Sequence, residues 1–286
     1  MEAKKVLIYV LMVLFLFYTA AAQEAEAVEE KEKKKKDPSF FKSLLKDQGH
    51  ILSSPFRMKG KDFALWGGAA LVTGILIAND EAIYREFKDY QARHQWVDDI
   101  SPKITKLGLG EWNLAIGGAF FLGGVLLKDK KAKETARLTL MTFIHTGIVV
   151  QIGKHVFGRQ EPGWDNGKDE WHWLDGFFKR YKSGQMPHYD AFPSGHTITI
   201  FGTATVISEM YKNTVWVPVL SYSLATLCGL SRVTEDTHWL SDVFLGAVLG
   251  YAIGKYVVKK RNRLGKLHIY PVANSHQLSI GVSYVF

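Results

Sequence analysis

The sequence predicts an all-α protein built around a six-helix bundle of the integral membrane type, with a short β-hairpin-like tail at its C-terminus. Two observations predict this fold class: six apolar segments precede residue 259, and residues 267–286 alternate as β-strands do. The segments are rich in Gly and Ala, which lets helix backbones approach closely. They are Phe63–Ala78, Leu114–Leu127, Leu138–Ile152, Thr197–Met210, Val215–Leu230 and Trp239–Val258.

These segments support helices more strongly than they support membrane spans. Several are shorter than the ~20 residues that a bilayer requires, and His145, Gln151 and Glu209 interrupt them. The mean hydropathy of the whole chain is close to zero. A peripheral periplasmic bundle is therefore the alternative to a transmembrane one.

The first 22 residues have the pattern of a secretory signal peptide. Lys4 and Lys5 precede an uncharged run, and small residues follow at positions 19–22. An uncleaved anchor is the alternative, although its apolar core would be short. Residues 23–62 then form a charged linker and an amphipathic lead-in, within which residues 24–37 have the composition of a disordered segment. The expected location is the bacterial cell envelope.

Two short polar motifs stand at the ends of apolar segments. The first is Pro-Ser-Gly-His at residues 193–196, and the second combines Ser231-Arg232 with His238 and Asp242. His238 and Asp242 are four residues apart, so on a helix they share one face. A carboxylate there can orient an imidazole and leave its other nitrogen free as a nucleophile. The set indicates phosphoryl-transfer chemistry.

The remaining polar groups fit the same chemistry. His196 begins an apolar run and is a candidate general acid. Arg232 offers several donors to phosphate oxygens. Ser194 and Gly195 precede an expected helix start, where free backbone amides favour an anion. Buried hydrogen-bonded histidines are the alternative for each residue alone, but not for the whole group.

Together the motifs resemble those of the type 2 phosphatidic acid phosphatases (PAP2), which share their active site with the vanadium haloperoxidases. Family members carry Lys-x6-Arg-Pro, then Pro-Ser-Gly-His, then Ser-Arg-x5-His-x3-Asp, and the last two motifs are complete here. In the first motif Lys154 and Pro162 are in register, but Glu161 occupies the arginine position. Arg159 is the nearest guanidinium. The resemblance covers residues 63–258 as a helical phosphatase domain, which leaves residues 259–286 as a basic segment and strand-like tail.

The resemblance implies a role for each matching residue. His238 would form a phosphohistidine, Asp242 would orient it, and His196 would protonate the leaving group and then activate water. Neither a metal nor another cofactor is implied. The groups expected to hold the phosphate oxygens are Lys154, Arg159, Ser194, Gly195 and Arg232.

Glu161 is the departure from the family pattern. A carboxylate pointed at phosphate would repel it, so either Glu161 turns away and Arg159 substitutes, or the activity is weakened. The first interpretation is favoured. Arg180, in the aromatic-rich insertion 163–191, is a second candidate to restore the lost charge. This insertion is either an interfacial lid or an aromatic mini-core.

The expected function is metal-independent hydrolysis of a lipid phosphate or diphosphate of the phosphatidate, phosphatidylglycerophosphate or undecaprenyl diphosphate class. The alternatives are a periplasmic acid phosphatase acting on soluble esters, a vanadate-dependent oxidase, and an inactive membrane scaffold. The formal net charge of +8 suits anionic lipid surfaces. Because the positive charge is scattered and no binding module is visible, nucleic acid is not an expected partner. The oligomeric state is open.

The expected location is the inner membrane, with the active site facing the periplasm. Basic residues at 128–133 and 259–263 favour the cytoplasmic side, and the motifs lie at the other end of the bundle. Six spans after a translocated N-terminus would reverse this orientation, so the side of the membrane is not fixed by sequence alone.

Overall fold

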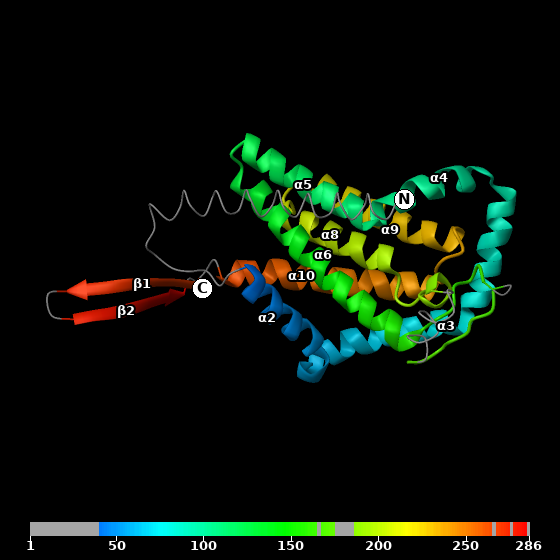
Figure 1. Ribbon diagram of the computed structural model, residues 1–286, viewed down its shortest axis with the longest axis horizontal. Coiled ribbons are helices and arrows are strands. Elements are labelled where there is room, and N and C mark those ends of the chain that lie inside the picture. The colour runs from blue at the N-terminus through cyan, green and yellow to red at the C-terminus, as the bar shows by residue number, and fades with distance from the viewer. Residues whose placement is uncertain (1–39, 165–166, 175–185, 265–266, 275–276, 285–286) are drawn as a thin grey trace.

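The computed structural model describes residues 40–164, 167–174, 186–264, 267–274 and 277–284 of the 286-residue chain. The expected signal peptide, residues 1–22, lies outside the described residues. Helices dominate the described part (Figure 1). They are α2 (Phe40–Leu52), α3 (Gly60–Arg93), α4 (Trp96–Ile104), α5 (Gly110–Leu126), α6 (Lys130–Phe157), α8 (Gly195–Met210), α9 (Trp216–Thr234) and α10 (Leu240–Leu264).

Three short 3-10 helices and two strands complete the described elements. The 3-10 helices are Ser54–Arg57, Thr105–Gly108 and Met186–Tyr189. Strands β1 (Leu267–Asn274) and β2 (Gln277–Tyr284) pair antiparallel after α10.

Each of the six apolar segments lies within one helix or overruns its end by a single residue, and the helices extend beyond the segments. The largest difference concerns α3, which continues past Ala78 to Arg93. The predicted segment ends at Ala78, shortly before charged residues begin at Asp80. The charged extension is stabilised by tertiary partners that the sequence does not reveal. Helices α2 and α4 were not predicted.

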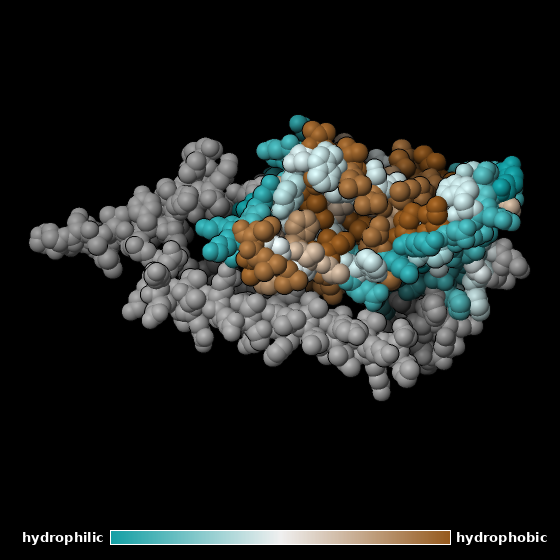
Figure 2. Space-filling view, turned by 90° about the horizontal axis from the view of Figure 1, so that it is seen from above, coloured by the Kyte–Doolittle hydropathy of each residue, from teal (hydrophilic) through white to brown (hydrophobic). Residues whose placement is uncertain are grey.

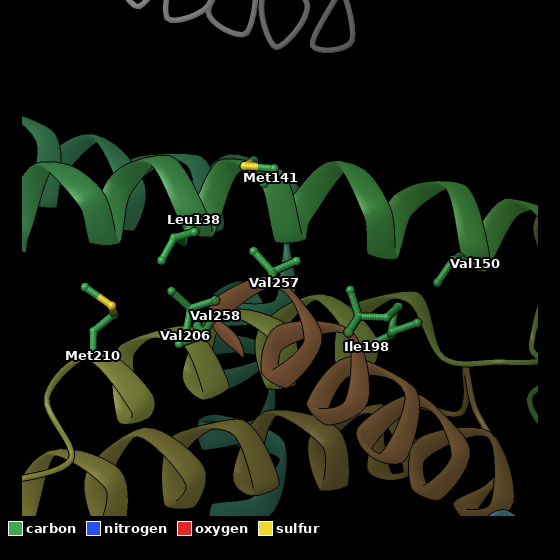
Figure 3. Close-up of a cluster of buried hydrophobic side chains, with 9 residues drawn as sticks. Leu138, Met141, Val150, Ile198, Val206, Met210, Val257 and Val258 are labelled. Carbon is green, nitrogen blue, oxygen red and sulfur yellow. The ribbon is translucent and has the colours of Figure 1, made fainter. Parts of the chain in front are cut away.

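The centre of the bundle is α8, which lies among α6, α9 and α10 (Figure 1). A Cβ atom at Gly254 of α10 would lie 2.8 Å from Thr205 Cβ of α8, so glycine permits this close approach. Figure 3 shows the apolar core between α6 and the α8–α10 pair. Its members are Leu138, Met141, Val150, Ile198, Val206, Met210, Ile253, Val257 and Val258.

Three described helices are long and apolar enough to cross a membrane: α3, α6 and residues 240–261 of α10. Helix α5, joined through a 61° bend to the segment Trp96–Gly108, makes a fourth candidate if the pair counts as one span. Exposed apolar side chains gather into a broad area with hydrophilic residues on either side (Figure 2). Leu71 of α3 and Leu126 of α5 are 66% and 79% exposed, which water would penalise. The chain is thus a membrane protein, with three or four candidate spans among its described helices.

The fold brings the ends of α6 and α8 together. Gly158 ends α6 with a left-handed backbone conformation (φ 52°). A Cβ atom at Gly153 would lie 2.5 Å from Pro193 Cδ, so a larger residue would separate α6 from the turn before α8. Ser194 then caps α8 by accepting a hydrogen bond from the Thr197 amide.

Candidate active site

Residues of all three motifs meet at one end of the bundle. They come from the end of α6, the start of α8, the end of α9 and the loop before α10, on the right in Figure 1. The Ser194 amide donates to the carbonyl oxygen of Asp242 at 3.1 Å. A Cβ atom at Gly195 would lie 3.8 Å from the Lys154 ammonium nitrogen. Residues distant in sequence thus share one site.

His238 is buried, and one of its ring nitrogens has a backbone partner. Nδ1 lies 2.7 Å from the carbonyl oxygen of Ala191. Because a carbonyl only accepts hydrogen bonds, Nδ1 carries the proton and Nε2 keeps its lone pair. Burial, followed by the positive charges of Lys154 and Arg232, lowers the pKa of His238 well below its usual value. The imidazole is therefore neutral, as a nucleophile must be.

The expected hydrogen bond from the His238 ring to the Asp242 carboxylate is not present. Oδ2 of Asp242 lies 3.8 Å from His238 Nδ1, a distance for electrostatic attraction and not for a hydrogen bond. This oxygen instead accepts from the Trp239 amide at 2.7 Å and caps the start of α10. The Ala191 carbonyl is the group that orients the ring, and Asp242 fixes the loop that carries it.

Arg159 does not reach the phosphate site, which corrects the expectation that it replaces the missing arginine. Its side chain is completely buried, and Nε, Nη1 and Nη2 all donate to protein acceptors. Nη1 lies 2.5 Å from Asp242 Oδ1, and Nη2 lies 2.7 Å from Asp80 Oδ2. Asp169 accepts from Nε and Nη2, and the Ser241 hydroxyl accepts from Nη1. Arg159 is the centre of a buried ionic cluster.

His196 is half-buried. Arg232, His238 and Lys154 are near enough to affect its charge. Burial first, then the charges of Arg232, His238 and Lys154, lowers the pKa of His196 to about 3. The ring is therefore neutral before substrate binds. A bound phosphate dianion opposes the effect of the two cations, which favours proton uptake by His196.

The two cations of the site already have acidic partners. Lys154 Nζ lies 2.9 Å from Asp190 Oδ2. Arg232 donates through Nη1 to Glu235 at 2.7 Å and to the Thr105 hydroxyl at 2.6 Å. Neither carboxylate was predicted, because Asp190 lies outside the motifs and Glu235 occupies a variable position between Arg232 and His238.

Glu161 does not turn away from the site, contrary to the favoured expectation. Its carboxyl group hydrogen-bonds to the Asp190 side chain and interacts with the charges of Lys154 and Arg232. Burial first, then the neighbouring Asp190 carboxylate, raises the pKa of Glu161 to about 8. Glu161 is thus mostly uncharged at neutral pH, which reduces the repulsion expected from a carboxylate. Arg180 lies outside the described residues.

Two predicted phosphate ligands occupy the start of α8. The Ser194 side chain is fully buried and accepts from the Thr197 hydroxyl at 2.9 Å, so it shapes the turn. The Gly195 amide belongs to the first turn of α8, whose amides have no partner within the helix. This helix start can hold an anion.

The described part of the insertion packs as an aromatic cluster on the site. Trp171 stacks with Trp173 at a centroid distance of 5.7 Å and meets Phe157 edge-on at 6.2 Å. Its ring also lies 4.5 Å from the Arg159 guanidinium carbon. These contacts favour the mini-core interpretation for these residues.

Within the described ranges, no group of three or more His, Cys, Asp or Glu side chains is arranged to hold a metal ion. The residues that the sequence analysis missed around Arg159 are Asp80, Asp169 and Ser241. One signal for Asp80 was available, since it is a charged residue two positions after the apolar segment that ends at Ala78.

Comparison with known proteins agrees with the motif resemblance. Residues 135–266 match the model of the PAP2 superfamily. A lipid A 1-phosphatase of Porphyromonas gingivalis is 33% identical over 110 residues, which are 38% of this chain and 20% of that protein. A probable lipid phosphate phosphatase 4 of Arabidopsis thaliana is 27% identical over 152 residues, 44% of each chain. The chain therefore spans less than half the length of these relatives.

Among solved structures, the crystal structure of Aquifex aeolicus LpxE is similar with a TM-score of 0.47 and 23% identity. The match covers 63% of this chain and 94% of that one.

Proposed function

We propose that this chain is a lipid phosphate phosphatase of the PAP2 superfamily, whose model matches residues 135–266, and that it acts through a phosphohistidine on His238. One observation carries the proposal: Nδ1 of His238 is bound to the Ala191 carbonyl, which leaves Nε2 free for attack. The names of the relatives, a lipid A 1-phosphatase and a lipid phosphate phosphatase, support a lipid substrate.

The reaction has two displacements. Nε2 of His238 attacks phosphorus, the ester P–O bond breaks, and the leaving oxygen takes a proton from His196. A water molecule then attacks the phosphohistidine and gives a proton to His196, which releases inorganic phosphate and restores both rings. Lys154, Arg232 and the Gly195 amide stabilise the charge that develops on the phosphate oxygens. Asp242 holds the nucleophile loop.

We place the site on the periplasmic side of the inner membrane. The basic segments 128–133 and 259–263 lie at the end of α6 and α10 opposite the site, and basic segments favour the cytoplasm. Helices α3, α6 and α10 are the spans of this arrangement, and α5, α8 and α9 complete a six-helix bundle. The proposed domains are a signal peptide (1–22), a linker (23–62), the phosphatase (63–258) and a tail (259–286).

The test is phosphate release by the purified full chain in detergent, with EDTA present. The panel contains phosphatidate, phosphatidylglycerophosphate, undecaprenyl diphosphate and a soluble aryl phosphate, and His238→Ala is the control. We expect the wild type to release phosphate from at least one lipid faster than from the aryl ester, and the variant to release none. Preference for the soluble ester would favour an acid phosphatase. No release from any substrate would leave the scaffold interpretation.

Glu161 makes phosphate hydrolysis sensitive to alkaline pH. The carboxyl group is neutral below its pKa of about 8 and becomes an anion above it. We therefore expect kcat/KM of the wild type to fall, on the order of tenfold, as the pH rises through 8, since a new charge beside the phosphate repels it. In Glu161→Gln this alkaline fall disappears, and Glu161→Arg raises kcat/KM at pH 9.

Glu170→Gln is the matched control, because Glu170 is exposed and loses the same charge. Its pH profile should follow the wild type. An alkaline fall that persists unchanged in Glu161→Gln would show that another group causes it.

A further inference from the structure

One face of α3 packs against the loop that carries His238. Asp80, Tyr84 and Lys88 are spaced by four residues, so they line one side of this helix. We call these three residues the clamp face. Helix α3 precedes residues 135–266, so the clamp face lies outside the part of the chain that matches the family model.

Asp80 binds Ser241 in the first turn of α10. It is completely buried and accepts a hydrogen bond from the Ser241 amide at 3.1 Å. It also accepts from the Ser241 hydroxyl and from Arg159 Nη2. Arg159 in turn binds Asp242. Asp80 therefore contacts Ser241 directly and is linked to Asp242 through Arg159.

Tyr84 and Lys88 contact the loop itself. Lys88 Nζ lies 3.0 Å from Asp236 Oδ2, and both side chains are about one-third exposed. The Tyr84 ring meets the buried Trp239 ring edge-on, at a centroid distance of 5.7 Å. The clamp face therefore contacts the chain on both sides of His238: at Asp236, two positions before it, and at Trp239, one position after it.

The same cluster reaches the acceptor that orients the histidine ring. The Ala191 amide donates to the carbonyl oxygen of Arg159 at 3.1 Å. The Ala191 carbonyl then accepts from His238 Nδ1. The indole nitrogen of Trp239 donates to the carbonyl oxygen of Gln160 at 2.8 Å. Asp80 and Arg159 thus lie at the start of a chain of contacts that runs through Ala191 to the His238 ring, and Gln160, next to Arg159, holds the neighbouring indole of Trp239.

We propose that the clamp face consists of positioning residues, which hold the imidazole of His238 in line with phosphorus; this rests on the proposed function. None of the three is placed in contact with substrate. Their loss should therefore weaken binding of a transition-state analogue and leave ground-state binding of phosphate almost intact.

Orthovanadate and inorganic phosphate are the two probes. Vanadate can take the five-coordinate geometry that requires attack by His238, whereas phosphate needs only the cations and the helix start. Competitive inhibition constants are measured for both, with kcat and KM, on the full chain in detergent. The variants are Asp80→Asn and Lys88→Gln. The control is Asp89→Asn, which makes the same chemical change on the exposed opposite side of α3.

We expect Asp80→Asn to lower kcat by about 10- to 100-fold and to raise the vanadate inhibition constant by a similar factor. KM and the phosphate constant should stay within about twofold of wild type, and Asp89→Asn should match wild type throughout. Lys88→Gln removes a partly exposed ion pair and serves as the test if Asp80→Asn fails to fold. It should lower kcat and raise the vanadate constant by about 3-fold, with KM and the phosphate constant unchanged.

Two results would overturn the proposal. A fall in kcat with an unchanged vanadate constant would mean that less protein is folded, not that His238 is misplaced. Equal behaviour of Lys88→Gln and Asp89→Asn would mean that the clamp face does not act on the nucleophile. An inactive wild type would instead remove the proposed function, and the clamp with it.

Discussion

Replacing His196 with alanine is expected to leave a chain that is phosphorylated once and then stalls. The leaving oxygen of p-nitrophenyl phosphate needs little help from an acid, so His238 can still attack. Hydrolysis of the phosphohistidine requires a base to activate water, and His196 is the imidazole beside His238 and the two cations. Rapid mixing should show a burst of about one nitrophenolate per chain, followed by a steady rate that is lower by roughly 10³-fold.

The matched control is His238→Ala, which should give neither a burst nor steady turnover, since no nucleophile remains. If His196→Ala shows no burst and keeps the wild-type steady rate, His196 is not the acid and base of the reaction. If both variants show a burst, the phosphorylated residue is not His238.

Replacing Arg159 with methionine is expected to cause a large loss of stability, because Arg159 is the shared partner of three carboxylates. Asp80, Asp169 and Asp242 would then be three carboxylates in a buried or nearly buried site without their shared counter-charge. Breaking a buried ion pair by removing one partner costs about 3–5 kcal/mol. Thermal unfolding in detergent should show a large fall in Tm, with activity lost in parallel.

Arg137→Met is the comparison, because Arg137 lies on α6 and pairs with Glu134 at 2.8 Å with its side chain 45% exposed. An exposed pair contributes about 0–1 kcal/mol, so Tm should change little. Adding Asp80→Asn and Asp169→Asn to Arg159→Met should recover part of the lost stability, since fewer unpaired charges remain. Equal Tm values for Arg159→Met and Arg137→Met would contradict the buried cluster.

The motifs predicted a resemblance to the PAP2 superfamily, and the model of that superfamily matches residues 135–266. They could be recognised because Pro193–His196 and the group from Ser231 to Asp242 each lie within one local stretch of chain. Apolar runs located the six main helices for the same reason. Local patterns are what sequence reasoning can recognise.

The predictions that failed were those that depended on where a side chain points. Arg159 was assigned to the phosphate because it is the guanidinium nearest in sequence, but three carboxylates from distant segments turn it inward. Glu161 was expected to turn away, yet it faces the site beside Asp190. Asp242 was paired with His238 by its spacing of four, but α10 begins after His238, and the carboxylate caps the helix instead. Helical spacing does not apply to a residue outside the helix.

The ion pairs Lys154–Asp190 and Arg232–Glu235 have a consequence for selectivity. Each cation is already paired with a carboxylate of the protein. An arriving phosphate must therefore displace that carboxylate before it gains a contact. A small phosphate ester has nothing to offset that loss. A lipid brings acyl chains that stay in the membrane beside the apolar helices, and these hold its headgroup at a high local concentration. The resting site therefore binds free phosphate, including the product of the proposed reaction, more weakly than it binds a headgroup held at the membrane.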